Sequence, residues 1–140
     1  MGEFTRDKTH WLHRLSPDEW IRAALGAIAQ AERAWARGDT RGGAAGTKRA
    51  AGMALNAALI VEPNEGWGRT YVEHLEALAI DSGVPEAVRV ACRRVLNAGP
   101  ELTGIIQLRT PRGHEAVVDA ARDVIAHAWV VVKRHEAIRD

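Results

Sequence analysis

Residues 16–38, SPDEWIRAALGAIAQAERAWARG, contain both the start signal and the apolar pattern of an amphipathic helix. Ser16 can accept a hydrogen bond from a free backbone amide of the first turn, and Glu19 completes a reciprocal capping box. Pro17 suits the first helical position, where its missing N–H costs nothing. Apolar residues then recur at helical spacing, namely Trp20, Ala24, Ala27, Ile28, Ala31 and Trp35. The stretch predicts a helix that begins at Pro17 and is ended by Gly38.

The next part of the chain predicts a turn and a central helix. Residues 39–46 are rich in glycine, which favours a turn. Residues 47–61 are rich in alanine and apolar nearly all round, with few polar members such as Asn56. A helix of this kind belongs in the middle of a bundle.

Three further helices are expected in the second half. Thr70 can cap a short helix that stops at residues 81–83, and Pro85 begins another that closes at residues 97–100. Residues 101–110 favour a short extended or 3₁₀ segment. Pro111 opens the last helix, whose apolar stripe is Val117, Ala121, Val124, Ala128 and Val131, widened by Ile125, Trp129 and Val132. No strand alternation is present, so we expect an all-α, up-and-down antiparallel bundle of about five helices.

Composition indicates one folded domain with a mixed surface. The 140 residues, 46% hydrophobic and 26% charged, predict a polar N-terminal tail (residues 1–15) and one bundle domain (residues 16–140). A net charge of +1 gives no support for a general nucleic-acid or membrane-surface field. Cys92, the single cysteine, excludes an intrachain disulfide and fits a core position. No apolar run resembles a signal peptide or a membrane span, so we expect a cytoplasmic protein and no membrane partner.

Motifs for metal, phosphate and nucleophile chemistry are weak. The six histidines show neither an H-E-x-x-H pattern nor Glu-x-x-His pairs repeated on two helices, so we expect no metal and no cofactor. Residues 41–48, RGGAAGTK, lack the order of a phosphate-binding loop, although a helix start there could hold an anion. The only serines, Ser16 and Ser82, fit a cap and a turn better than a nucleophile.

Three stretches follow one another in an order that a known family shares. They are an Ala-rich segment, KRAAGMALNAAL (residues 48–59), a capped segment with a histidine, GRTYVEHLEAL (residues 68–78), and a long closing segment, EAVVDAARDVIAHAWVVV (residues 115–132). Together they resemble the HEPN family, small helical domains found alone or beside minimal nucleotidyltransferases in prokaryotes. The resemblance covers residues 16 to about 134 and implies a helical bundle.

Many HEPN domains are metal-independent ribonucleases with an arginine followed by a histidine after four to six residues. The resemblance therefore implies Arg122 and His127 as the catalytic pair, the histidine as general acid–base and the arginine as the partner of the phosphate. About two such pairs are expected by chance in this composition, and four occur. Residues five apart on a continuous helix lie about 140° apart around its axis, so Arg122 and His127 would not share a face, which favours a helix-flank histidine at position 127.

Other functions remain open at this stage. A binding or interaction module is favoured, as a homodimer or with a minimal nucleotidyltransferase or another protein of a toxin–antitoxin system, and RNA is a possible partner. A nucleotide or phosphate ligand is the alternative, and it predicts convergence of four cations, Arg41, Lys48, Arg49 and Arg69. Trp67, Arg69 and His74 are the candidate ligand or partner contacts. Trp67 can also be read as a lid over one end of the bundle.

Overall fold

The structure is a computed structural model that describes residues 4–7, 9–98 and 113–139. Within these residues the chain forms five α-helices and one 3₁₀ turn and contains no strand. The elements are α1 (Pro17–Ala36), α2 (Thr40–Val61), η1 (Glu65–Trp67), α3 (Tyr71–Ala79), α4 (Glu86–Asn97) and α6 (Gly113–Arg139). The expected all-α helical bundle is confirmed.

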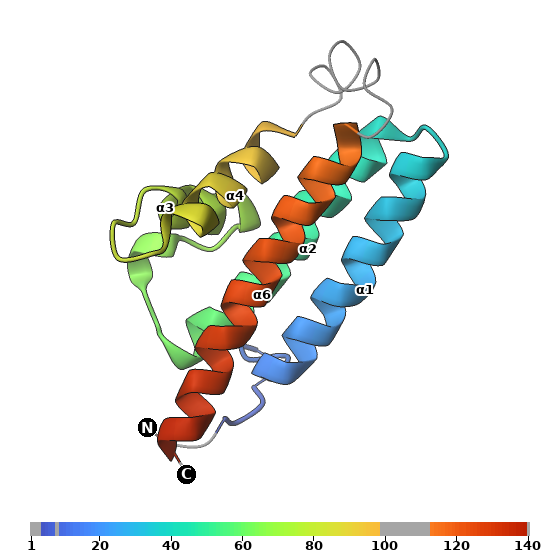
Figure 1. The fold of residues 1–140 in the computed structure, drawn as a ribbon. Helices are drawn as coiled ribbons and strands as arrows, with labels where there is room; N and C mark the ends of the chain where they lie inside the picture. Colours follow the sequence, from blue (N-terminus) through green and yellow to red (C-terminus); the bar gives the residue numbers. More distant parts are fainter. Residues whose placement is uncertain (1–3, 8, 99–112, 140) are drawn as a thin grey trace.

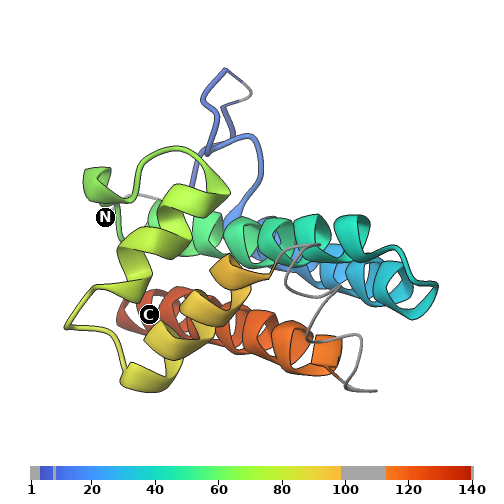
Figure 2. The same ribbon diagram turned by 90° about the horizontal axis from the view of Figure 1, so that it is seen from above.

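Three long helices, α1, α2 and α6, lie side by side and enclose most of the core (Figure 1). The ion pair between Glu32 and Arg122 joins the end of α1 to the first half of α6, which fits the opposite directions of these helices. Glu62, just after α2, pairs with Arg134 near the end of α6, so α2 and α6 run the same way. The short helices α3 and α4 pack on one side of this trio, as the view from above shows (Figure 2).

The first helix follows its sequence signals closely. The Ser16 hydroxyl accepts a hydrogen bond from the Glu19 amide at 3.2 Å, and the Glu19 carboxylate accepts one from the Ser16 amide at 2.9 Å. The chain leaves the helix through Gly38, whose φ of 85° is readily available only to glycine. Trp20 and Trp35 are 1% and 5% exposed, so the predicted apolar stripe does face the core.

The prediction of a turn over residues 39–46 is wrong, because α2 already begins at Thr40. Asp39 caps this start by accepting a hydrogen bond from the Gly42 amide at 2.8 Å. A Cβ atom on Gly43 would lie 2.5 Å from the ring of Trp35. Glycine serves here to bring α1 and α2 close together, a role that composition alone does not distinguish from a turn.

The last helix buries its predicted stripe but not the tryptophan beside it. Val117, Val124 and Val131 are at most 5% exposed. Trp129 is 47% exposed, so its assignment to the core is wrong. It lies about 100° around the helix axis from the buried Ala128, which turns it away from the core. Lys133 lies over its ring. The expected segment 101–110 and the expected start at Pro111 lie outside the described residues. Across the described part of the chain, no helix has both the length and the apolar character that a bilayer span requires.

Candidate functional site

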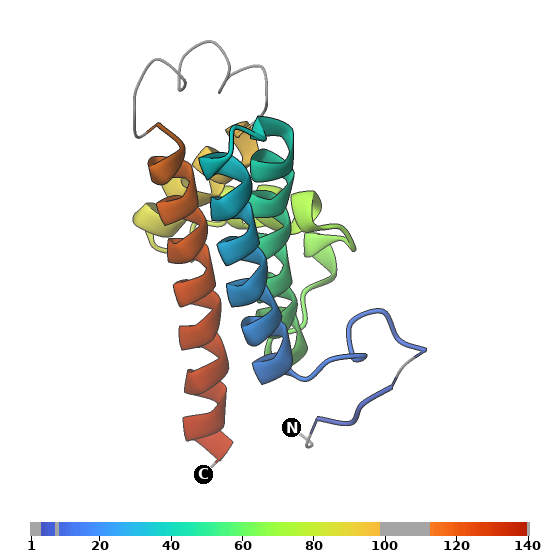
Figure 3. The same cartoon turned by 90° about the vertical axis from the view of Figure 1, so that its right-hand side faces the viewer.

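A hollow of about 380 Å³ lies where the N-terminal segment, α2 and the start of α3 meet. We call it the basic hollow, and its lining residues are Trp11, Arg14, Asn56, Arg69, Thr70 and Tyr71. Figure 3 shows the N-terminal segment and the chain around η1 on the same side of the three long helices. The volume is at the lower end of the range for small-molecule sites in proteins.

The N-terminal wall of the basic hollow is fixed by its own contacts. Leu12 is 8% exposed, and its carbonyl accepts a hydrogen bond from the indole N–H of the buried Trp20 at 2.9 Å. The Arg6 guanidinium donates to the carbonyl of Arg14 at 2.7 Å. Because Leu12 is anchored, its neighbours Trp11 and Arg14 are held at the hollow. The tail expected from sequence therefore supplies two of the lining side chains.

The opposite wall is the first turn of α3. The Thr70 hydroxyl accepts a hydrogen bond from the Glu73 amide at 3.1 Å, and the Glu73 carboxylate accepts one from the Thr70 amide at 3.1 Å. The same carboxylate also accepts one from the Arg69 amide at 3.3 Å. This second capping box sets the position of Arg69 and Thr70, both of which line the hollow.

Behind the hollow lies a buried polar pair, His74 and Asn56, which are 0% and 2% exposed. Nδ1 of His74 lies 2.8 Å from the carbonyl oxygen of Trp67, and Nε2 lies 2.9 Å from the side-chain oxygen of Asn56. Burial lowers the pKa of His74, while the Trp67 carbonyl and the Glu73 charge act in the opposite direction. His74 thus holds η1 against α2 and contacts the one buried polar side chain that lines the hollow.

The three ligand or partner contacts expected from sequence, Trp67, Arg69 and His74, lie close to one another. The rings of Trp11 and Trp67 lie 6.0 Å and 6.1 Å from the His74 ring, centroid to centroid. The Arg69 guanidinium carbon lies 5.4 Å from the centroid of the Trp11 ring, a cation–π distance. Trp67, Arg69 and His74 therefore belong to one cluster.

The charge around the basic hollow is one-sided. Arg14 and Arg69 line it, and no carboxylate of the described residues does. Arg14 lies over the ring of Trp20 at 5.5 Å, and neither arginine forms an ion pair with any described residue. Both side chains belong to exposed residues, so their charges are available to a ligand from solvent.

Of the four cations expected to converge, only Arg69 lines the basic hollow. Arg41 and Arg49 are exposed on α2, and Lys48 is partly exposed on the same helix. The structure supplies Arg14 from the N-terminal segment in their place. The sequence contained no helical periodicity or cap that would have placed Arg14 near Arg69.

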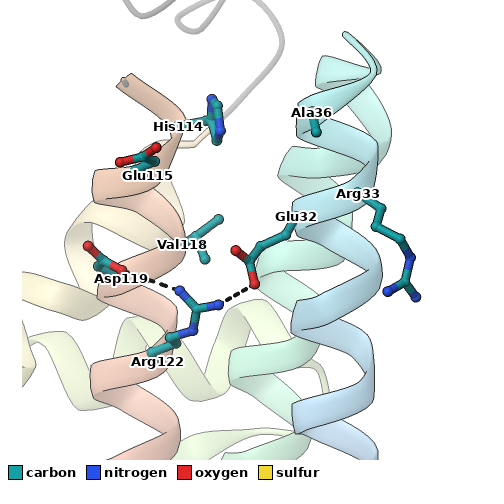
Figure 4. A pocket seen from close by; sticks show the side chains of 8 residues that line it. All are labelled: Glu32, Arg33, Ala36, His114, Glu115, Val118, Asp119 and Arg122. Atoms are coloured by element: carbon teal, nitrogen blue, oxygen red, sulfur yellow. Dashed lines mark hydrogen bonds and ion pairs between the residues drawn. The ribbon is translucent and has the colours of Figure 1, made fainter. Parts of the chain in front are cut away.

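Arg122, the arginine of the expected ribonuclease pair, lies in a different hollow of about 400 Å³ between α1 and α6 (Figure 4). Its guanidinium bridges two carboxylates, pairing with Glu32 and lying 3.4 Å from Asp119. Glu115 adds a third carboxylate to the lining, and Arg33 points away (Figure 4). We call this cavity the mixed-charge hollow. Three carboxylates line it together with Arg122, and their negative charges disfavour a phosphate there.

His127 lies in a separate environment further along α6. Burial lowers the pKa of His127, the charge of Arg134 acts in the same direction, and the charge of Glu62 opposes them. These two residues belong to the end of the bundle where α2 stops. Among the described residues, no hydrogen bond or ion pair links Arg122 to His127.

Asn56, Trp11 and Arg14 are the site residues that sequence reasoning did not single out. Asn56 carried the clearest signal, because a polar residue in the middle of a buried helix needs a hydrogen-bond partner. Among the described residues, no group of three His, Cys, Asp or Glu side chains is placed to hold a metal ion. Comparisons with protein-family models, curated proteins and solved structures gave no match to this chain.

Proposed function

We propose that this protein is a binding module for a small molecule that carries a phosphate group, held in the basic hollow. One observation carries the proposal: two guanidinium groups and a buried amide line one hollow that no carboxylate of the described residues lines. Guanidinium groups suit phosphate because their N–H donors match its oxygens in pairs.

The contrast with the mixed-charge hollow supports this choice. Arg122 is already neutralised by Glu32 and Asp119, so a phosphate would have to displace or face carboxylates there. In the basic hollow the nearest capping carboxylate, Glu73, accepts hydrogen bonds from the amides of Arg69 and Thr70. The guanidinium groups of Arg14 and Arg69 keep their charge for a ligand.

One further feature of the basic hollow favours an anion. Asn56, 2% exposed, lines the hollow, and its side-chain nitrogen has no hydrogen-bond partner among the described residues. In the arrangement that the structure shows, this NH₂ group can donate a hydrogen bond to a ligand oxygen.

Calorimetric titration with inorganic phosphate tests the proposal. Arg14→Ala and Arg69→Ala should each weaken binding at least about tenfold, since a hydrogen bond to a charged group contributes roughly 1.5–3 kcal/mol. The matched control is Arg41→Ala with Arg49→Ala, which removes two exposed cations outside the basic hollow. Phosphate binding that the control weakens as much as the test variants, or no saturable binding at all, would overturn the proposal.

Four expectations stay predictions: a homodimer, and the three that the family resemblance implies, namely HEPN membership, a minimal nucleotidyltransferase partner and ribonuclease activity. The last has a direct test in the cleavage of mixed RNA by the wild type and by His127→Ala. Equal background cleavage by both proteins would remove it.

A further inference from the structure

The hydrogen bonds of His74 constrain where its protons lie. A carbonyl oxygen only accepts, so Nδ1, which faces the Trp67 carbonyl at 2.8 Å, carries a hydrogen in either charge state of the ring. The second nitrogen, Nε2, faces the Asn56 amide at 2.9 Å. In the neutral ring Nε2 is an acceptor, and in the cation it is a donor. The Asn56 amide therefore has to present a different end to His74 in each state.

Each charge state of His74 leaves a different atom of Asn56 for the basic hollow. With a neutral His74, the amide nitrogen of Asn56 must donate to Nε2, and its oxygen is left for the hollow. With a cationic His74, the amide oxygen accepts from Nε2–H, as in the arrangement of the structure, and the NH₂ group is left for the hollow. A half-turn of the amide interconverts the two arrangements without a change of shape.

An anion distinguishes these arrangements. The carbonyl end of Asn56 repels it, whereas the NH₂ end donates to it and has a positive ring directly behind. We infer that an anion in the basic hollow and a proton on His74 stabilise each other through the amide of Asn56. This inference rests on the proposed function, and it makes His74 a positioning residue, because His74 is not among the residues that line the hollow.

Of the two hydrogen bonds of the His74 ring, the one to Asn56 leads to a residue that lines the hollow. Glu73 on the same helix is the charged group that favours the proton, and the rings of Trp11 and Trp67 beside it are uncharged. Burial lowers the pKa of His74 and so favours the neutral ring in the unliganded protein, in which the Asn56 amide takes the other of the two arrangements. Two other titratable groups, His10 and His13, lie on the N-terminal segment beside Trp11, and a test has to separate them from His74.

Sulfate is the probe for the test, because it keeps its two charges throughout the range pH 5.5–7.5. Calorimetric titration of the full chain in buffers of different ionisation enthalpy measures the protons taken up on binding. We expect uptake of up to one proton, and an affinity that rises by as much as about tenfold for each pH unit lowered, because linkage is reciprocal. In the double variant His10→Gln, His13→Gln the uptake should persist, and in His74→Gln it should vanish.

Nitrogen NMR of the wild type makes the test independent of whether His74→Gln folds. Added sulfate should convert the His74 ring from one protonated nitrogen to two at pH 6.5. Sulfate binding without proton uptake and without this conversion would overturn the inference while leaving the proposed function intact. Absence of saturable binding of both sulfate and phosphate by the wild type would instead remove the proposed function. Uptake that disappears in the His10, His13 double variant would assign the proton to the N-terminal segment and overturn the role of His74.

Discussion

Tyr71 sits directly on Gly52: a Cβ atom on this glycine would lie 2.2 Å from the Cβ of Tyr71. This contact seats the first turn of α3 on the middle of α2, one turn before Asn56. Gly52 lies in a helix interior, where glycine costs about 0.5–1 kcal/mol relative to alanine. The close approach of α3 gives a physical reason for that residue, and the geometry of the basic hollow depends on it.

Gly52→Ala should therefore lower the free energy of unfolding. The gain in helix propensity is about 1 kcal/mol. Overpacking, which costs about 1–3 kcal/mol, outweighs it, because the clash is with the Cβ atom of Tyr71 and a change of rotamer does not relieve it. Gly26→Ala is the matched control, since nothing lies within 4 Å of a Cβ atom there, and it should stabilise by about 0.5–1 kcal/mol. Urea denaturation measures both. Equal stabilisation by the two variants would contradict the seating of α3 on Gly52.

Cys92 should react with a thiol reagent only when the chain opens. It is 0% exposed in α4, and burial raises the pKa of its thiol to about 12, while the nearby Arg93 acts in the opposite direction. Reaction needs the thiolate, which is scarce at pH 8 under these conditions. Labelling in the native state should be slower by orders of magnitude than labelling in urea. Rapid native labelling would place Cys92 in a locally opened part of the fold.

The helix starts and the core stripes could be predicted from sequence, because they depend on neighbours in the chain. Ser16 and Thr70 both cap the helices that they were expected to cap. Two predictions were wrong, the turn over residues 39–46 and the burial of Trp129, and both have the same cause. Whether a glycine turns the chain or receives a neighbouring helix, and whether a flanking aromatic is covered, depends on elements distant in sequence.

The residues of the candidate site also fall into two groups, those that a local sequence pattern could predict and those that only the fold brings together. Trp67, Arg69 and His74 lie within eight residues of one another, so a local pattern could group them. Arg14 and Asn56 join them only through the folding of the N-terminal segment and α2 against α3. No spacing rule connects positions 14, 56 and 69, which is why the four-cation hypothesis selected arginines and a lysine from α2 instead.

Removing Arg122 should change stability little. Its ion pairs with Glu32 and Asp119 join side chains that are 44–71% exposed, and solvent screens pairs of this kind. Arg122→Ala should lower the free energy of unfolding by no more than about 1 kcal/mol, measured in urea at low salt. Phosphate affinity should stay unchanged in this variant. A large loss of phosphate binding in Arg122→Ala would move the candidate site from the basic hollow to the mixed-charge hollow.

Acid should destabilise the ligand-free protein in a pH range set by histidine. Burial lowers the pKa of His13, His74 and His127 from the ordinary value of 6.5. The unfolded chain then binds more protons than the folded one below that value, so the stability is present above pH 6.5 and is lost as the pH falls. Hydrogen bonds from Thr70 and Arg69 lower the pKa of the Glu73 carboxyl, whose contribution is lost only below its ordinary value of 4.5. Between pH 7.5 and 5.5 the histidines therefore dominate.

Thermal unfolding across this pH range, with and without sulfate, separates the contribution of His74 from that of His127. His74→Gln and His127→Gln should each flatten the fall in Tm between pH 7.5 and 5.5, because each removes one group that the fold keeps neutral. Saturating sulfate should also flatten it in the wild type, since a bound anion favours the proton on His74 that the empty fold resists. In His74→Gln the same sulfate should raise Tm by an amount independent of pH. A wild-type Tm that rises on acidification without sulfate would mean that the fold favours the charged histidines, contrary to the burial of His74 against Asn56.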